Sequence, residues 1–506
     1  MYQSNILERL VKDKVKFSQL KYTFIGIFIV GIITHGYIMT HNFVNSDGIY
    51  YFYSENMDMT VSGRWLLNLI CKISGDYTIP WFLGILSMLY IAVGTYFLIM
   101  FFDIRNEWNI LVVSGIIVAS PVVTATFGYM FTADAYFFSY ALATFAAYMI
   151  KKFELKSPFF WVGVAAICLS MGIYQAYVEV TVIMLMLDSI AVIFNTEKLQ
   201  KCCGIVCRYL IALFMGAFLY FGVLEIILKK KKLQLLSYQG INEVKVIDLK
   251  SIIYRIPNLY NDTIMYFRNG ELTANNIYIL NAYKILAFIS MIIAFFYLWR
   301  KKSIWKTSFA CAVIGIIPIA LNMFNLFSDK TINHLLMKMG WVICLLVGFI
   351  LVDQFDKKLR LVSLLGILII LNYGRIANEV YVNVEQKQEK TYAVCLKLSD
   401  RMEQVKGYYE GIPIIIEGEP NDSYSLTSQL PGELYDIPQV SGDFYITDAA
   451  MFAYAFRNHI GTAFNYVYDN ETVMKIKSSK EWKNMEVWPE SESVKIIDGY
   501  LCIRFR

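Results

Sequence analysis

Charge is scarce in this chain, and its scarcity excludes a soluble globular protein. Only 17% of the 506 residues are charged, whereas 57% are hydrophobic, and the mean hydropathy is +0.48. A soluble chain of this length needs far more polar surface, so the composition indicates a polytopic membrane protein. No segment combines a basic patch with stacking aromatic residues, so no nucleic-acid partner is expected.

Residues arranged to bind metal ions or nucleotides are missing as well. The four histidines are dispersed, and the nine cysteines follow no metal-ligand spacing. No glycine-rich phosphate loop precedes a helix in the C-terminal region, so a nucleotide-sugar domain is not expected. Cys395 and Cys502 could form a disulfide there, or both could remain free thiols.

Long apolar runs, in contrast, are abundant and predict about eleven membrane spans of roughly 17–25 residues each. The run at 158–194 is too long for one helix, and the sequence GIYQAY at 172–177 favours a break within it. The predicted spans lie at 22–40, 80–102, 109–128, 133–150, 158–173, 177–194, 205–228, 281–299, 308–326, 338–353 and 361–378.

Lysines and arginines in the short loops predict that the N-terminus is cytoplasmic. The basic tail 1–21 has no small-residue cleavage site before the first span, so we expect it to be retained. A transmembrane domain at 22–380 then exposes two long loops, 41–79 and 229–280, at the outer face of the plasma membrane.

The final segment, 381–506, lacks such apolar runs and predicts a small extracytoplasmic α/β domain. About four short strands and two helices are expected. A helix is expected at QEKTYAVCLKLSDRMEQV, strands are expected at 412–418, 494–498 and 500–505, and a further element is expected at FYITDAAMFAYAF (444–456). The whole chain is thus predicted to be an all-α polytopic membrane protein with a small α/β domain. That domain could capture an acceptor or cover a cavity.

The first outer loop contains the residues that point to chemistry. Its sequence, HNFVNSDGIYYFYSENMDMTVSGR at 41–64, places acids, an arginine and tyrosines at a membrane boundary, where carboxylates are costly to desolvate. Asp47 precedes Gly48, which lets the backbone approach a substrate, and partial burial would raise the pKa of Asp47 toward working pH. The alternative is that Asp47 caps the N-terminus of the following helix.

Other polar residues near the predicted outer face each have two possible roles. Asp134, at the outer end of the fourth predicted span, is a second candidate acid or a helix N-cap. Arg64 and Trp65 offer a forked phosphate donor and a plane for a sugar, or an interfacial anchor. Glu55 and Asp58 could hold a divalent ion such as Mg or Mn, or could form a solvated loop face.

Substrate contacts are also predicted at the helix break and in the later outer segments. Tyr174, Gln175 and Tyr177 could line a cavity, where irregular backbone is tolerated, or could form interhelical hydrogen bonds. Lys229 and Lys230 could attract the phosphate of a lipid carrier, or lipid headgroups in general. Additional phosphate candidates are Arg255, Arg268 and His334, the last followed by Lys338.

Three segments resemble a known family. SDGIYYFY…SGRWLLNLI (46–70), FGYMFTADAYFFSYALATFAAYMI (127–150) and SMGIYQAYVEVTVIMLML (170–187) are similar to the serotype-converting membrane glucosyltransferases (Gtr type II) of the GT-C class. The ending WPESESVKIIDGYLCIRF also resembles that family. The resemblance implies a GT-C-like fold and transfer of a sugar from a polyprenyl-phosphate donor to a cell-surface glycan such as O-antigen. It assigns Asp47 as the base and Asp134 as a second acid.

We therefore predict a membrane hexosyltransferase, with glucose as the expected sugar, acting on a glycan at the outer face. An inverting reaction needs one base, whereas a retaining one needs a second carboxylate as nucleophile. The alternative function is a transporter or flippase for a lipid-linked saccharide. That alternative predicts inverted repeats and charged residues within the spans, where Asp188 and Glu225 are the nearest examples.

Overall fold

The computed structural model describes residues 13–43, 45–50, 59–75, 77–196, 199–236, 249–269, 292, 303–327, 334–352, 361–419, 437, 440 and 449–506. They belong to two compact units. The first unit comprises Met1–Thr40 and Asn56–Asn378, and the second comprises His41–Glu55 and Glu379–Arg506. The first outer loop is therefore divided between the two units.

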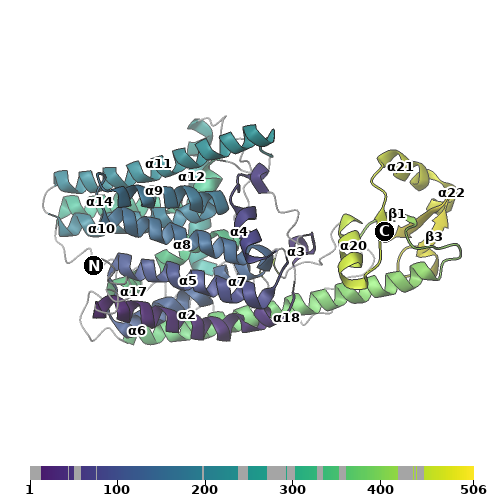
Figure 1. The fold of residues 1–506 in the computed structure, drawn as a ribbon, viewed down its shortest axis with the longest axis horizontal. Helices are drawn as coiled ribbons and strands as arrows, with labels where there is room; N and C mark the ends of the chain where they lie inside the picture. Colours follow the sequence, from purple (N-terminus) through teal and green to yellow (C-terminus); the bar gives the residue numbers. More distant parts are fainter. Residues whose placement is uncertain are drawn as a thin grey trace, which may run out of the picture. The chain divides into compact units, whose positions relative to one another are not determined.

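The first unit is a bundle of apolar helices (Figure 1). Helix α2 packs against α5 and α6, α5 packs along α8, and α9 lies between α8 and α11. Its long helices are α2 (Lys14–Thr40), α5 (Pro80–Phe102), α6 (Glu107–Ala119), α8 (Met130–Lys152), α9 (Pro158–Ile173), α10 (Val178–Asn195), α11 (Leu199–Lys231), α12 (Leu249–Asn269) and α14 (Ile304–Leu321). Its short ones are η2 (Met59–Ser62), α4 (Leu67–Ser74), α7 (Pro121–Phe127), η3 (Gln175–Tyr177), α15 (Met323–Phe327), η6 (Leu335–Met337), α16 (Met339–Leu345) and α17 (Val347–Val352).

Within the described residues, five helices are long and apolar enough to cross a membrane, or six if the bent pair α6–α7 counts as one span. The predicted span 109–128 is this pair, bent by 45° where Pro121 begins a new helix, because proline cannot donate the N–H that would continue the old one. The predicted span 338–353 is divided into α16 and α17. The predicted span 281–299 lies, apart from one residue, outside the described residues.

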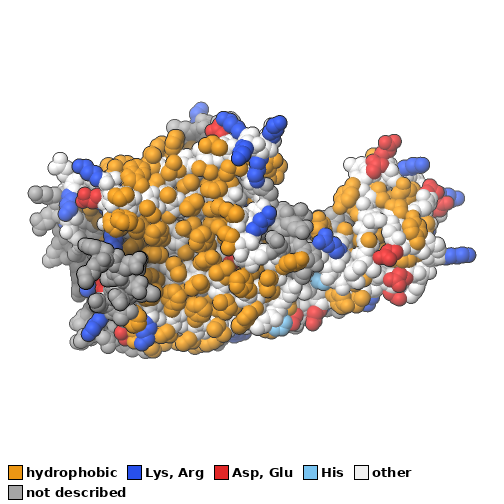
Figure 2. Space-filling view, in the orientation of Figure 1, with side chains coloured by type: hydrophobic (Ala, Val, Ile, Leu, Met, Phe, Trp, Pro, Cys, Tyr) orange, Lys and Arg blue, Asp and Glu red, His pale blue; other side chains and the backbone are white. Residues whose placement is uncertain are grey.

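Hydrophobic side chains cover most of the visible face of the helical unit, with lysines and arginines gathered toward its ends (Figure 2). Ile33, Phe214 and Ile226 are each about two-thirds exposed. A water-soluble protein does not expose an apolar surface of this extent, whereas lipid chains solvate it without penalty. The chain is therefore a membrane protein.

The second unit is built on a four-stranded sheet with the strand order β2-β1-β4-β3. Strand β1 (Pro413–Glu417) runs parallel to β2 (Asn465–Tyr466) and β4 (Tyr500–Arg504), and β3 (Val494–Ile497) pairs antiparallel with β4. The β3–β4 hairpin turns through Asp498 and Gly499, whose φ angles of 48° and 80° suit the tight hairpin turn of an Asp-Gly pair. The three predicted strands are confirmed, and β2 is an addition.

Helices surround this sheet. They are α18 (Leu361–Glu403), which begins in the first unit, with α3 (Ser46–Tyr50), α20 (Ala449–Ala455), the π-helix η9 (Phe456–Ile460), α21 (Asn470–Ser478), α22 (Lys480–Lys483) and η10 (Ser491–Ser493). Cys395 of α18 and Cys502 of β4 are buried free thiols, so the disulfide considered from the sequence does not form. Successive strand residues face opposite sides of a sheet. Leu501 and Ile503 share a core with Cys395, whereas Cys502 lies in the core on the other side.

Candidate functional site

A helix break at Tyr174 organises the polar site of the first unit. Helix α9 ends at Ile173, Tyr174 takes an extended backbone conformation (φ −152°, ψ 110°), and the chain resumes through η3 into α10. The last carbonyls of a helix have no partner within it. The Gly172 carbonyl is one of these, and it accepts a hydrogen bond of 2.8 Å from the Leu66 amide. The break predicted from GIYQAY is confirmed, and the loop before α4 docks on it.

Trp65 packs directly on this helix end. A Cβ atom added to Gly172 would lie 2.6 Å from the indole ring of Trp65, so only glycine leaves room for the ring. The indole Nε1 is buried and has no hydrogen-bond partner among the described residues. Trp65 is thus held by its apolar face while its single donor is unused.

The preceding turn is fastened by two side chains that bond to its backbone. Gln175 Nε2 donates to the Ser62 carbonyl at 2.9 Å and to the Tyr220 hydroxyl at 3.0 Å, and that hydroxyl donates to the Gly63 carbonyl at 3.0 Å. Gly63 has φ +80°, and a Cβ atom there would lie 2.5 Å from Gln175 Nε2. The turn therefore requires glycine for both its conformation and its close contacts. It fixes the next residue, Arg64.

Arg64 lies on a pair of stacked tyrosines. Its Nη1 donates to the Tyr136 hydroxyl at 3.1 Å, and its guanidinium carbon is 4.8 Å from the ring centroid of Tyr174. The two tyrosine rings are 4.3 Å apart and nearly parallel, at 16°. Tyr177, also predicted to line the site, is fully buried, with its ring 5.6 Å from that of Tyr174. The structure thus brings Arg64, Trp65, Tyr174 and Gln175 together.

Two more basic residues approach Arg64 from the segment before α16. Burial, followed by the positive charges of Arg64 and Lys338, lowers the pKa of His334 from its ordinary 6.5 to about 4. Lys338 is only 3% exposed, and its ammonium lies 4.8 Å from the ring centroid of Trp341. His334 therefore lies within electrostatic range of two basic side chains, Arg64 and Lys338, that belong to distant segments. The folded protein favours the neutral imidazole, so the stability that depends on it is complete above pH 6.5 and declines toward pH 4.

Glu179 is the acid next to this basic cluster, and it is not among the residues predicted from the sequence. It lies in the first turn of α10, is 3% exposed and feels the charge of Lys338. Its Oε1 has no hydrogen-bond partner in the described part of the chain. A Cβ atom on Gly340 would lie 2.5 Å from that oxygen, so α16 approaches it closely. An acid two residues after GIYQAY was the signal available in the sequence.

Asp134 occupies a different environment. It is 1% exposed in α8, and the N-cap of that helix is Tyr129, so Asp134 is not a cap. Its side chain lies near Ser74 of α4, whose hydroxyl donates to the Cys71 carbonyl at 3.0 Å. Neither carboxylate oxygen of Asp134 has a well-aligned hydrogen bond within the described residues. A buried carboxyl group without well-aligned hydrogen bonds costs folding free energy, which favours a functional or positioning role for Asp134.

Asp47 belongs to the second unit, in the first turn of α3. The side chain of Asn45 accepts a hydrogen bond of 2.8 Å from the Gly48 amide, so Asn45 provides the cap that was considered for Asp47. The expected partial burial of Asp47 is wrong. Gly48 and Ile49 form the buried face of this short helix, which leaves the Asp47 carboxylate exposed.

The remaining basic candidates lie on other elements. Lys229 and Lys230 are exposed in the last turn of α11, where Lys229 pairs with Glu225 at 2.7 Å. Arg268 is exposed near the end of α12. Arg255, also on α12, donates to the Leu326 carbonyl at 3.1 Å. These residues are not part of the cluster around Arg64.

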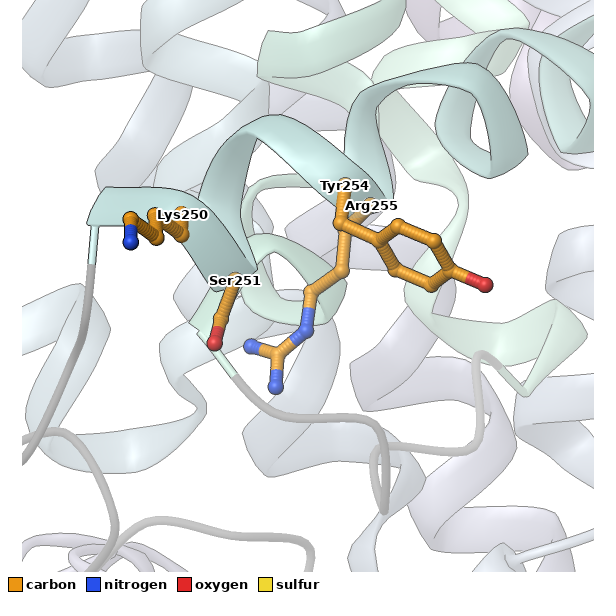
Figure 3. Close-up of a pocket in the computed structure, with 4 residues that line it drawn as sticks. All are labelled: Lys250, Ser251, Tyr254 and Arg255. Atoms are coloured by element: carbon orange, nitrogen blue, oxygen red, sulfur yellow. The ribbon is translucent and has the colours of Figure 1, made fainter.

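Arg255 also lines an open polar pocket of about 340 Å³ at the start of α12. The other lining residues are Lys250, Ser251 and Tyr254, and Figure 3 shows the Ser251 hydroxyl and the Arg255 guanidinium on the same side of the helix. Two basic groups and a hydroxyl suit an anion. The pocket is a shallow accessory feature rather than an enclosed substrate site.

A metal site is not formed by the residues that the structure describes. No group of three His, Cys, Asp or Glu side chains among them could hold an ion. Glu55 and Asp58, the candidates for Mg or Mn, lie outside the described residues.

Comparison with known proteins gives one match. Residues 36–347, more than half of the chain, match the family model described as "Glucosyl transferase GtrII". No curated protein and no solved structure matches the chain. The matched range contains Asp47, Asp134, the loop around Arg64, the helix break with Glu179, and His334 with Lys338.

Proposed function

Because this chain belongs to the GtrII glucosyl transferase family, we propose that it transfers glucose from a polyprenyl-phosphate donor to a cell-surface glycan. The transfer takes place at the outer face of the plasma membrane. The family match confirms the resemblance predicted from the sequence, and the apolar helices provide the membrane anchor. The observation that carries the choice of donor is the convergence of Arg64, His334 and Lys338 beside two stacked tyrosines.

Basic groups and aromatic rings in this arrangement suit a sugar phosphate. The forked guanidinium of Arg64 can bind two phosphate oxygens, and the stacked rings of Tyr136 and Tyr174 hold it in place. Lys338, which is 3% exposed, adds a basic group to the site, and the buried Glu179 lies within its electrostatic range. The basic groups of the site can therefore bind an anion.

The reaction joins the acceptor to carbon 1 of glucose and breaks the bond between that carbon and the phosphate oxygen. The acceptor hydroxyl attacks carbon 1 from the face opposite the phosphate, and the anomeric configuration inverts. Asp47 takes the hydroxyl proton as general base, an effect typically worth about 10²–10⁴ in rate. The leaving polyprenyl phosphate keeps the bonding electron pair, and Arg64 and Lys338 stabilise its charge.

Other polar residues have supporting roles in this proposal. Asp134, the second acid that the resemblance assigns, is buried against α4, the helix that directly follows Arg64 and Trp65, so it suits a positioning role through that helix. Lys229 and Lys230, at the exposed end of α11, attract the anionic carrier to the membrane surface. A divalent ion held by Glu55 and Asp58 would neutralise the same phosphate.

The acids that would have favoured a transporter are both paired. Asp188 is bonded to Lys151 at 2.7 Å and accepts a hydrogen bond of 2.6 Å from the Tyr209 hydroxyl. Glu225 pairs with Lys229 one helical turn away. A buried acid that binds a lysine and a tyrosine of the same bundle fits a structural role better than an ion pathway.

The test is transfer of radiolabelled glucose from polyprenyl phosphate to candidate glycans by purified wild type and Asp47→Asn. We expect the variant to retain its fold and to lose at least about a hundredfold in turnover. The matched control is Asp103→Asn. Asp103 is an exposed aspartate at the C-terminal end of α5, and asparagine accepts its left-handed backbone conformation. Equal turnover of wild type and Asp47→Asn would remove Asp47 from the reaction. Labelling of Asp47→Cys by an impermeant thiol reagent tests the outer location.

A further inference from the structure

The helix that contains Asp47 is held by residues 379–506 of the second unit, which we call the C-terminal unit. Gln388 Nε2 of α18 donates to the Asn42 carbonyl at 3.0 Å, and Asn458 Nδ2 of η9 donates to the Ile49 carbonyl at 3.3 Å. Phe43 and Ile49 are 7% and 2% exposed. The segment is therefore fastened at both ends by side chains that follow it in sequence by more than 300 residues.

Helix α3 needs this support. It has five residues, and helices much shorter than about 12 residues are not stable in water on their own. Its internal bonding includes the Asn45 cap on Gly48 and a 3.2 Å bond from the Ile49 amide to the Asn45 carbonyl. The backbone of α3, which contains Asp47, is consequently supported by the contacts of Ile49 with the rest of the unit.

The element that contacts α3 has an unusual conformation. Phe456–Ile460 is a π-helix, a rare form that occurs mostly at functional sites. Phe456 anchors it in the core of the unit, with its ring centroid 4.8 Å from that of Phe464. The ring centroid of His459 lies 6.1 Å from that of Tyr392 in α18. The wider turn lies between these two anchors and contains Asn458, whose amide is thereby directed at the Ile49 carbonyl. Asn458 Oδ1 is buried and has no partner among the described residues, so the donor is the part of this side chain that is used.

We propose that the C-terminal unit positions the general base: Asn458, with Gln388, fixes α3 and so sets the direction of the Asp47 carboxylate. This inference rests on the proposed function, in which Asp47 takes the acceptor proton. It gives the C-terminal unit a role in the rate of transfer rather than in donor affinity. Asn458 and Gln388 are positioning residues because neither one reacts.

The experiment compares Asn458→Ala and Gln388→Ala with matched amide controls, Asn470→Ala and Gln404→Ala, which change exposed side chains of the same unit away from α3. Hydrogen exchange at Gly48 and Ile49 is measured in the full-length, detergent-purified proteins. Loss of one bond to α3 should accelerate that exchange about fivefold, while exchange in β1 and β4 stays unchanged. The same preparations should show kcat for glucose transfer reduced about ten- to a hundredfold, with an unchanged KM for the donor.

The two readouts separate this inference from the proposed function. Unchanged exchange in both variants overturns the inference, and so does faster exchange with unchanged kcat. Because Gln388 is a surface residue, its variant keeps the test valid if Asn458→Ala unfolds. Hydrogen exchange is measured without a donor. If the wild type transfers no glucose, the proposed function is refuted. The exchange rates of Gly48 and Ile49 still show whether the C-terminal unit holds α3.

Discussion

Replacing Arg64 by alanine tests whether its guanidinium does more than bridge two tyrosines. In the structure it donates one hydrogen bond to Tyr136 and lies over the ring of Tyr174. A hydrogen bond from a charged donor contributes about 1.5–3 kcal/mol, and a cation–π contact at a partly exposed site contributes about 0.5–1 kcal/mol. Because Arg64 is only partly buried, we expect the lower end, a loss of about 2 kcal/mol in unfolding free energy.

The catalytic effect should be larger than this structural effect. Removing one group that stabilises developing charge typically costs about 10²–10³ in kcat, and the departing phosphate is such a charge. Tyr136→Phe is the matched control, because it removes the hydroxyl that accepts from Arg64 but keeps the stacked ring. Its cost should be about 1 kcal/mol, or about fivefold in turnover. Arg64→Lys keeps the charge without the planar fork, so an intermediate loss is expected.

The assay follows release of polyprenyl phosphate and labelling of the acceptor under single-turnover conditions, with thermal unfolding of each variant in the same detergent. Turnover should decrease in the order wild type, Tyr136→Phe, Arg64→Lys, Arg64→Ala. If Arg64→Ala and Tyr136→Phe lose the same amount, the role of Arg64 ends with its contact to the tyrosine. The assignment of the phosphate site to this cluster would then be wrong.

Three further changes test the contacts around the site and the bundle. Gly172→Ala places a methyl group 2.6 Å from the Trp65 indole, so chemical denaturation should show a loss of about 1–3 kcal/mol, and unchanged stability would contradict the contact. Asp188→Asn removes the charge bonded to Lys151, so the unfolding free energy should fall by about 1–3 kcal/mol and Tm should fall with it. Turnover per folded molecule should not change, and a loss of turnover at full stability would favour the transport hypothesis. His334→Gln should flatten the loss of stability between pH 6.5 and about pH 4, because the wild type must protonate a buried imidazole there; parallel pH profiles would refute this.

Features set by local sequence were predictable. The apolar run 80–102 coincides with α5, where Pro80 begins the helix because its missing N–H is not needed there. The break at 172–177 followed from the length of the run, which exceeds a bilayer crossing. Strands β3 and β4 followed from the alternation of apolar residues at 494–498 and 500–505. Each of these signals lies within a few residues of the element that it specifies.

Features set by distant contacts were not predictable. The hydrogen bond that joins α3 to the C-terminal unit connects residues 409 positions apart, and the loop sequence alone gives no sign of it. Glu179 escaped notice for a related reason. Its burial depends on Gly340 and Lys338, which approach from a helix far along the chain. A cap at Asp47 was only the alternative to its catalytic role, and Asn45, which has the same capping chemistry two residues earlier, provides the cap instead.

The distribution of charge explains why one chain would combine a membrane bundle with a separate α/β unit. The bundle concentrates Arg64, Lys338 and the neutral imidazole of His334 around a break where apolar helices expose polar backbone, and burial increases the effect of the two charges. An ionised base placed among these groups would pair with them and would lose its basicity toward a sugar hydroxyl. Asp47, the base of the proposed function, is instead an exposed residue on a short helix of the other unit. The affinity for the phosphate and the basicity of the acid can then be set by different sets of residues.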